Sequence, residues 1–262
     1  MPGFGTQFGS KRFGMELDDS PLVVPSPWLN RFYTDFTLPP SMGRFLGGGS
    51  ITEASGVLTV GVALGVDGDW ATNVAPIAWV PAHAGQFSFD TVFKYEARMP
   101  FFTSSGGEAR AGIVIYKDQD NGHEFGHYAG DLRIYTTRWY AGAGGNTANS
   151  GVLATPTASP HAYRIYWNPT SRPIYIQDGT LEFTINANNL QCYYRVGDSG
   201  TWTLLLTYGW EWTPGDVHFG LCAHNYVAQK RSVSAQFSYA LVYQWDARTQ
   251  RMLPLQNQVS FS

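Results

Sequence analysis

Apolar and polar side chains alternate with a period of two along many short segments of this chain, and this pattern is the strongest constraint on its fold. The longest example runs from Val233 to Trp245, where every second residue is apolar or aromatic. Successive side chains of a β-strand point to opposite faces, so such a segment is typical of a half-buried strand. No stretch of ten or more residues has a 3.6-residue period. The sequence therefore predicts an all-β chain with few, short helices.

Further segments repeat the pattern. In 87–95, Phe87, Phe89, Phe93 and Tyr95 share one face, while Lys94 and Glu96 belong to the other. The same reasoning predicts one long strand over 233–245 and further strands at 51–60, 111–117, 163–167, 181–185, 190–196, 202–208 and 217–223. Turn residues such as Asp178-Gly179 separate several of them.

Length and composition favour a single sandwich with short appendages. The chain has 262 residues, 15% of them aromatic and only 14% charged, well below the ~25% charged residues of an average globular protein. We expect an extended N-terminal arm at 1–30, one β-sandwich domain at 31–246 and a C-terminal tail at 247–262. The polar, glycine-rich segment 141–159 reads as a long loop.

Charge and apolar patterning exclude several partners. A net charge of -3 with scattered cations gives no basic surface for nucleic acid. Apolar runs are too short for a membrane span, and the first residues lack the apolar core of a secretory leader. Cys192 and Cys222 are expected to be free and buried, as in a protein assembled in a reducing cytoplasm.

The first thirty residues carry aromatics without any strand or helix period. Phe4, Phe8 and Phe13 each precede a glycine, and Trp28 follows a proline-rich stretch. Disordered tails avoid aromatics because nothing buries them. These four side chains therefore indicate a segment that docks, either on a partner or on the chain's own sandwich.

Several segments, in this order, resemble the concanavalin A-like lectin/glucanase superfamily, in particular its laminin-G-like and glycosidase-accessory branch. They are FYTDFTLPP, GGGSITEASGVLTV, FSFDTVFKYEAR, AGIVIYKDQDN, YRIYWN, QCYYRVGDSGTWTLL, VHFGLCAHN and VSAQFSYALVYQ. The resemblance implies a two-sheet antiparallel jelly-roll sandwich. Its members include lectins, glycosidases, adhesion modules and virus-particle components, so the fold leaves function open. An insertion at 168–180 and the arm depart from the pattern.

The superfamily's retaining glucanases carry Glu-x-Asp-x-Glu on one strand, which places acid and nucleophile ~5 to 5.5 Å apart. The closest pairs in this chain are Asp67 with Asp69 and Asp118 with Asp120, and neither continues to a third carboxylate in phase. We therefore expect no catalytic residues and no enzyme.

Calcium is the one cofactor that the residues suggest. Asp118, Asp120, Asn121 and Glu124 offer the hard oxygens that Ca²⁺ takes. The alternative is an Asx-rich turn that caps the strand before it, and we favour that alternative because the spacing is not that of a known calcium loop. His123 and His127 would lie ~13 Å apart along a strand, too far to share a zinc ion.

Aromatic groups near loops are candidates for sugar binding, because sugar C–H faces stack on aromatic rings while their hydroxyls take hydrogen bonds. Most aromatics of a sandwich must instead fill its core. The candidates are Tyr135, Arg138, Trp139, Tyr140, Trp210 and Trp212.

Together these features favour a non-enzymatic structural and attachment module. We expect a phage-particle component, such as a decoration, tail or fibre-associated protein, assembled in the host cytoplasm and extracellular after release. Its partners would be capsid or tail proteins, or a second copy of itself, and cell-surface carbohydrate would be a further ligand. The alternatives are a carbohydrate-binding module and, less favoured, a glycoside hydrolase or lyase with dispersed carboxylates.

Overall fold

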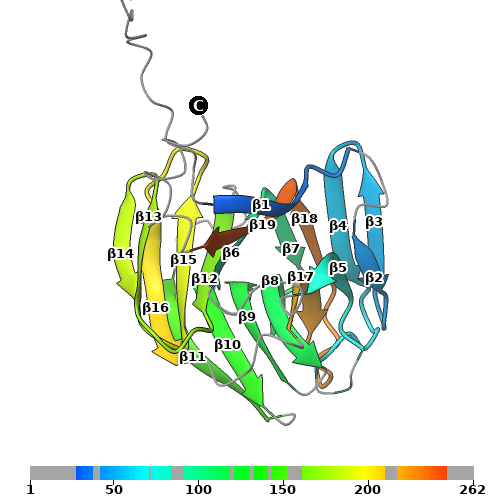
Figure 1. The fold of residues 1–262 in the computed structure, drawn as a ribbon. Helices are drawn as coiled ribbons and strands as arrows, with labels where there is room; N and C mark the ends of the chain where they lie inside the picture. The colour runs from blue at the N-terminus through cyan, green and yellow to red at the C-terminus, as the bar shows by residue number, and fades with distance from the viewer. Residues whose placement is uncertain are drawn as a thin grey trace, which may run out of the picture.

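The computed structural model shows an all-β chain (Figure 1). It describes residues 28–37, 42–70, 72, 74–83, 91–118, 121–129, 133–140, 143–152, 161–209 and 217–246. Over these ranges the chain forms strands, turns and bends and no helix. It follows that no helix in this described part has the length and apolar character needed to cross a membrane.

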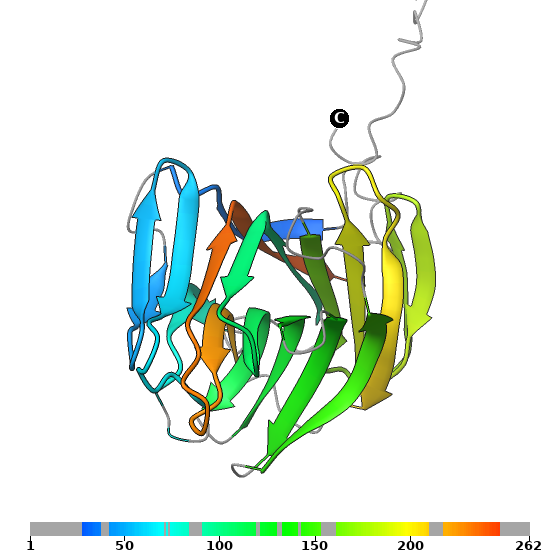
Figure 2. The same cartoon turned by 180° about the vertical axis from the view of Figure 1, so that it is seen from behind.

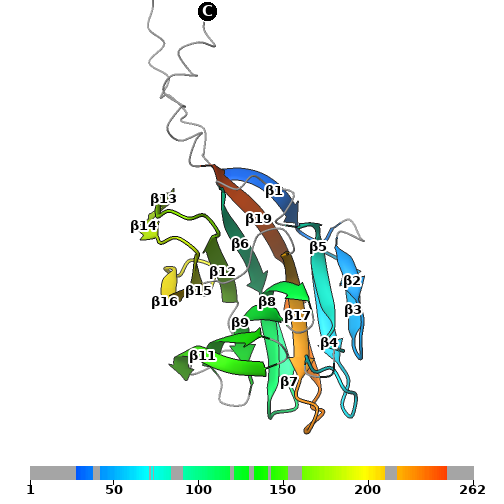
Figure 3. The same cartoon turned by 60° about the horizontal axis from the view of Figure 1, so that its bottom comes forward.

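A six-stranded antiparallel sheet forms one layer of the sandwich, in the order β1-β19-β6-β12-β15-β16. Figure 3 shows β1, β19 and β6 side by side. In sheet order, the strands are β1 (Trp28–Thr34), β19 (Tyr239–Asp246), β6 (Thr91–Met99), β12 (His161–Asn168), β15 (Asn189–Val196) and β16 (Thr203–Gly209).

A four-stranded sheet, in the order β3-β4-β18-β7, continues this layer. The strands are β3 (Ser50–Ala54), β4 (Val57–Val62), β18 (Val233–Phe237) and β7 (Phe101–Ser104). The paired strands β6 and β19 pass into the paired strands β7 and β18 at Pro100 and Ser238. Proline has no N–H to donate, so the ladder breaks there, while the amide of Ser238 still donates to the carbonyl of Arg98 over 3.0 Å.

The second layer is a seven-stranded sheet in the order β11-β10-β9-β8-β17-β5-β2. Figure 2 shows this sheet from behind. The strands are β11 (Ala143–Val152), β10 (Arg133–Tyr140), β9 (Asn121–Tyr128), β8 (Ala109–Asp118), β17 (His218–Asn225), β5 (Ile77–His83) and β2 (Gly43–Phe45).

The main core fills the space between the two layers. Phe93 of β6 lies 5.7 Å from Phe219 of β17, centroid to centroid, and both side chains are buried. The hydroxyl of Tyr95 donates to the carbonyl of Gly220 over 2.6 Å, which ties β6 to the opposite sheet. The sandwich and the inward face expected for Phe93 and Tyr95 are thus confirmed.

A separate hairpin covers the outer face of the six-stranded sheet. It consists of β13 (Ile174–Asp178) and β14 (Leu181–Ile185) and lies beside β15 and β16 in Figure 1. Ile174, Ile176 and Ile185 pack with Tyr166 and Trp245 in a second apolar cluster. The first strand of the hairpin, β13, falls inside the segment 168–180 that departs from the superfamily pattern, and β14 follows directly after it.

Three sequence predictions about strands were wrong. The segment 233–245 is two strands in different sheets, because the chain changes sheet at Ser238. The segment 51–60 is also split, by the Ser55-Gly56 turn, where both residues have positive φ. Finally, 143–152 is a strand paired with β10 rather than part of a loop.

Both cysteines are free and buried, as the sequence predicts. Cys192 lies in the main core, whereas Cys222 lies on the opposite side of its strand from Phe219 and Leu221. The expected arm overlaps with the sheet, because its last residues, Trp28 to Asn30, pair with β19.

Candidate functional site

The outer face of the six-stranded sheet carries an ordered array of charged and aromatic side chains, which we call the polar face. Neighbouring residues of an antiparallel pair share a face, so the register arranges them in three rows across β19, β6, β12 and β15. The rows are Tyr239, Arg98, Ala162 and Arg195; then Leu241, Glu96, Arg164 and Tyr193; then Tyr243, Lys94, Tyr166 and Gln191.

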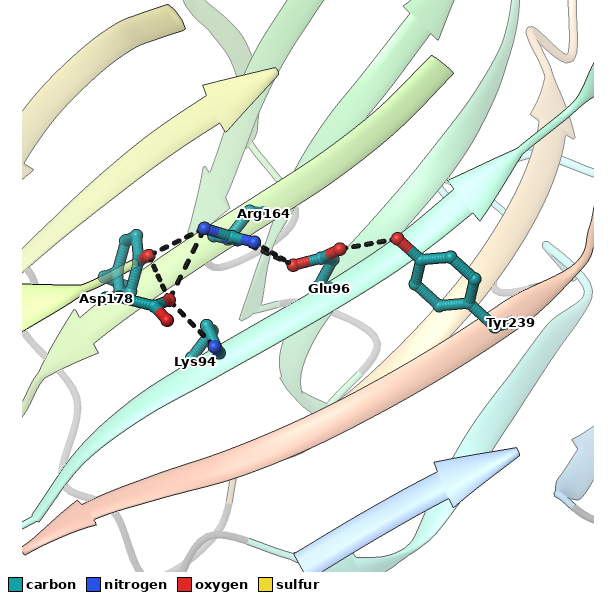
Figure 4. Close-up of polar contacts among 6 residues, drawn as sticks. Lys94, Glu96, Arg164, Asp178 and Tyr239 are labelled. Carbon is teal, nitrogen blue, oxygen red and sulfur yellow. Dashed lines mark hydrogen bonds and ion pairs between the residues drawn. The ribbon is translucent and has the colours of Figure 1, made fainter. Parts of the chain in front are cut away.

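Arg164 is at the centre of the polar face (Figure 4). Its Nε donates to Oε2 of Glu96 over 2.6 Å, and its guanidinium group lies 3.9 Å from the ring of Trp202. The other oxygen of Glu96 accepts a hydrogen bond from the hydroxyl of Tyr239 over 2.5 Å. Arg164 and Glu96 are both buried, so this is a desolvated ion pair that depends on its complete set of partners.

Asp178 brings the hairpin into the same network. Its Oδ2 accepts hydrogen bonds from Nζ of Lys94 over 2.8 Å and from the hydroxyl of Tyr166 over 2.6 Å, and Nη1 of Arg164 lies 3.4 Å away. Burial alone raises the pKa of Asp178, but the charges of Lys94 and Arg164 and these hydrogen bonds outweigh it and lower the pKa. Burial lowers the pKa of Lys94.

The edge of the polar face near the β15–β16 turn is more exposed. Arg98 forms a two-point ion pair with Asp198, with distances of 2.7 and 2.9 Å, and its third nitrogen donates to Ser238. The guanidinium group of Arg195 lies 4.9 Å from the ring of Trp202. Trp202, Arg98 and Arg195 are all partly exposed. This edge therefore offers an aromatic ring and cationic groups to a ligand.

A second polar cluster lies on the outer face of the seven-stranded sheet. Oε2 of the buried Glu124 is 2.7 Å from Nε2 of His224, and the thiol of Cys222 contacts its other oxygen over 3.3 Å. Burial alone raises the pKa of Glu124. The neighbouring His224, Arg110 and Tyr135 outweigh that effect and lower the pKa to about 2. Glu124 is thus an anion enclosed by protein donors.

The sequence candidates for sugar binding have different outcomes. Tyr135 is 1% exposed and packs beside Arg110, so little of its ring can contact a ligand. Arg138, Trp139 and Tyr140 have their backbone in β10, but their side chains are outside the described part of the structure. Trp210 and Trp212 fall outside it entirely, as do the side chains of the expected docking residues Phe4, Phe8, Phe13 and Trp28.

Three of the four candidate calcium ligands, Asp118, Asn121 and Glu124, lie in the described part of the structure. Asp118 ends β8 and pairs with Asn121, the first residue of β9, while Asp120 lies outside the described residues. Glu124 faces His224 and Cys222, so both of its oxygens are engaged by the protein. In the part of the chain that the structure describes, no three His, Cys, Asp or Glu side chains are grouped so as to hold a metal ion.

His123 and His127 contact different groups in the core. Nε2 of His123 is 2.8 Å from the hydroxyl of Thr136, whereas Nδ1 of His127 is 3.2 Å from the hydroxyl of Tyr163. Each imidazole is thus held by a hydroxyl group of its own.

Sequence reasoning missed the polar face itself. The alternation assigns Lys94 and Glu96 to the polar side of their strand, and two opposite charges on that side are the signal that could have located the polar face. The partner of Arg164, Asp178, comes from a hairpin that the alternation did not define completely. Alternation also assigns Tyr239 to the same side as Phe237, and only the change of sheet at Ser238 moves it to the outer face.

Comparisons with known proteins support the fold. Neither a scan of family models nor a search of curated proteins finds a match. Many solved structures have a similar fold, and three of them illustrate it.

One is a xylan β-1,4-xylosidase from Bacillus halodurans C-125, with a TM-score of 0.52 and 13% identity over 80% of this chain and 38% of that one. Another is the CBM2 module of an evolved Dit from Lactobacillus casei BL23 phage J-1, with a TM-score of 0.51 and 12% identity over 83% of this chain and 96% of that one. A third is lectin I-B4 from Griffonia simplicifolia, with a TM-score of 0.50 and 12% identity over 81% of this chain and 98% of that one. At these identities the similarity establishes a lectin-like β-sandwich fold and nothing further. This chain spans about two fifths of the xylosidase.

Proposed function

We propose that this chain is a non-enzymatic glycan-binding module that serves attachment as a component of a phage particle. The observation that carries the glycan-binding part is the partly exposed edge of the polar face, where the ring of Trp202 lies 4.9 Å from the guanidinium group of Arg195. Sugars bind proteins through stacking of their C–H faces on aromatic rings and through hydrogen bonds from polar side chains. This edge offers both kinds of contact.

The state of the carboxylates favours binding over catalysis. A retaining glycosidase needs two carboxylates that reach the same glycosidic bond. On the polar face Glu96 is held by Arg164 and Tyr239, and Asp178 is held by Lys94 and Tyr166. Their hydrogen bonds to the protein compete with any contact to a substrate.

The particle part of the proposal rests on two supports. One of the similar structures is a module of a phage Dit protein and covers 83% of this chain. The aromatic arm that precedes β1 supplies the second, because burying each Phe side chain on a partner would contribute ~1.5 to 3 kcal/mol. A carbohydrate-binding module outside any particle is the alternative.

Trp202 provides the test of glycan binding. The purified chain is first screened on a glycan array, and the best ligand is then titrated calorimetrically against Trp202→Ala. We expect a loss of about tenfold in affinity, since a ring stacked on a sugar contributes about 1.4 kcal/mol. Tyr226→Ala is the control, because Tyr226 is 44% exposed but lies in the loop after β17. No binding to any glycan would refute this part.

The arm provides the test of particle association. Residues 1–27 are deleted, which leaves β1 and its pairing with β19 intact. We expect the truncated chain to keep its circular dichroism spectrum and melting temperature but to be lost from purified particles. Incorporation at the level of the full chain would refute the anchor.

A further inference from the structure

Among the residues whose side chains the structure describes, the charges on the polar face do not balance. Lys94, Arg98, Arg164 and Arg195 are its cations, while Glu96, Asp178 and Asp198 are its carboxylates. Lys94 and Arg164 are paired with Asp178 and Glu96, and Arg98 takes both oxygens of Asp198. One cation, Arg195, is left without a carboxylate of its own.

One donor of Arg195 also has no hydrogen-bond acceptor among the described residues. Its Nε is shielded from solvent and has no partner among the residues that the structure describes. The guanidinium group is positioned nonetheless, because it lies over the ring of Trp202 and its Cγ packs beside Gly200 of the turn. Because the Nε is shielded, the two terminal nitrogens of this oriented guanidinium group are the donors that could meet the two oxygens of a carboxylate.

The register places Arg195 close to a second arginine. Arg98 and Arg195 are both neighbours of Ala162, on β6 and β15 respectively, so their Cα atoms are separated by two strand spacings, roughly 10 Å. Asp198, whose side chain is 65% exposed, is the carboxylate that Arg98 binds. The field of two arginines is therefore offset by one carboxylate at the surface.

We propose that Arg195 and Trp202 bind the carboxylate and the ring of an acidic sugar, such as a uronic acid, and that Asp198 competes with that carboxylate. This inference rests on the proposed glycan binding and narrows it to acidic glycans. The exposed part of the Trp202 ring contacts the pyranose ring, while the terminal nitrogens of Arg195 donate to the carboxylate. Arg98 stays paired with Asp198 and adds long-range attraction.

The test compares trigalacturonate with its methyl ester, which has the same sugar rings but no charge, by isothermal titration calorimetry at low salt. We expect the acid to bind about tenfold more tightly than the ester, as one charge-assisted contact would give. Arg195→Gln should abolish that difference, and Arg195→Lys should restore part of it, because charge returns without the planar donors. Asp198→Asn should increase the affinity for the acid.

Arg44→Gln is the matched control, because Arg44 is an arginine of β2 that is paired with Glu53. It should leave both affinities unchanged. Equal binding of acid and ester, or an Arg195→Gln variant that keeps the full difference, would overturn this inference while leaving glycan binding in place. Binding of neither trigalacturonate nor any neutral glycan would overturn both proposals. Each variant's melting temperature is measured, and the Arg195→Lys variant tests the role of Arg195 if the Gln variant unfolds.

Discussion

His127 shows how burial in this sandwich changes the chemistry of a single residue. It packs between Phe102 and His161, and burial lowers its pKa from 6.5 to about 3, with a smaller effect from His161. The folded state therefore keeps His127 neutral at pH values where the unfolded chain binds a proton. Its contribution to stability is complete above pH 6.5 and is lost as the pH falls toward 3.

We expect the free energy of unfolding to decrease between about pH 7 and pH 5, with His127 contributing a slope of up to about 1.4 kcal/mol per pH unit. This window excludes Glu124, whose folded pKa of about 2 against 4.5 gives it an effect only at lower pH. Urea unfolding at several pH values measures the slope. His127→Phe should flatten it, and an identical slope in the variant would contradict the assignment.

The sequence predicted the burial of some residues but not the partners of others. The alternation correctly placed Phe93 and Tyr95 in the core and predicted two free, buried cysteines. It could not pair Arg164 with Asp178, because that contact depends on how a hairpin folds back over the sheet. Contacts of this kind are absent from a local pattern.

Among the elements, burial on both faces did not by itself decide which strands were predicted. β12 and β17 are buried at nearly every position and were predicted, whereas β9 was missed. β9 is buried along nearly its whole length, and polar and apolar residues do not alternate in its sequence, NGHEFGHY. β11 consists mainly of small and polar residues, and it is a strand because it pairs with β10. Tertiary pairing overrides weak local preference in such segments.

The β13–β14 hairpin depends on the polar face for its position. We expect Asp178→Ala to speed amide hydrogen exchange across Ile174–Ile185, because the hairpin loses its bonds to Lys94 and Tyr166. Exchange in β6 should change less. Hydrogen exchange with mass spectrometry measures both.

Glu182→Ala is the control within the same hairpin, because the contacts of Glu182, with the exposed Gln177 and Tyr175, stay within the hairpin and do not reach the sheet. Unchanged exchange in Asp178→Ala would mean that apolar packing alone holds the hairpin.

For the whole molecule, the sandwich followed from the sequence but the location of its ligand-binding surface did not. Ten or so alternating segments are enough to require two packed sheets. The same architecture serves proteins of unrelated function, and the site depends on which outward positions carry Arg, Trp and Tyr. Those positions acquire meaning only once the register sets them side by side.

Global stability should control the reactivity of the two thiols. Cys192 and Cys222 are fully buried, and burial raises the pKa of both. We expect neither thiol to react with a water-soluble disulfide reagent in the native protein and both to react at once in guanidinium chloride. The labelling rate should follow the unfolding equilibrium across a urea series. Fast labelling without denaturant would contradict this compact core.

The change of sheet at Ser238 has a practical consequence for engineering. Up to Phe237 the odd-numbered positions of this segment face the interior, and after it the even-numbered Ala240 and Val242 do so. A variant library built to alter ligand preference should therefore randomise 239, 241 and 243 and conserve 240 and 242. A library designed from the uninterrupted sequence motif would choose the opposite set and would scramble the packing between the layers.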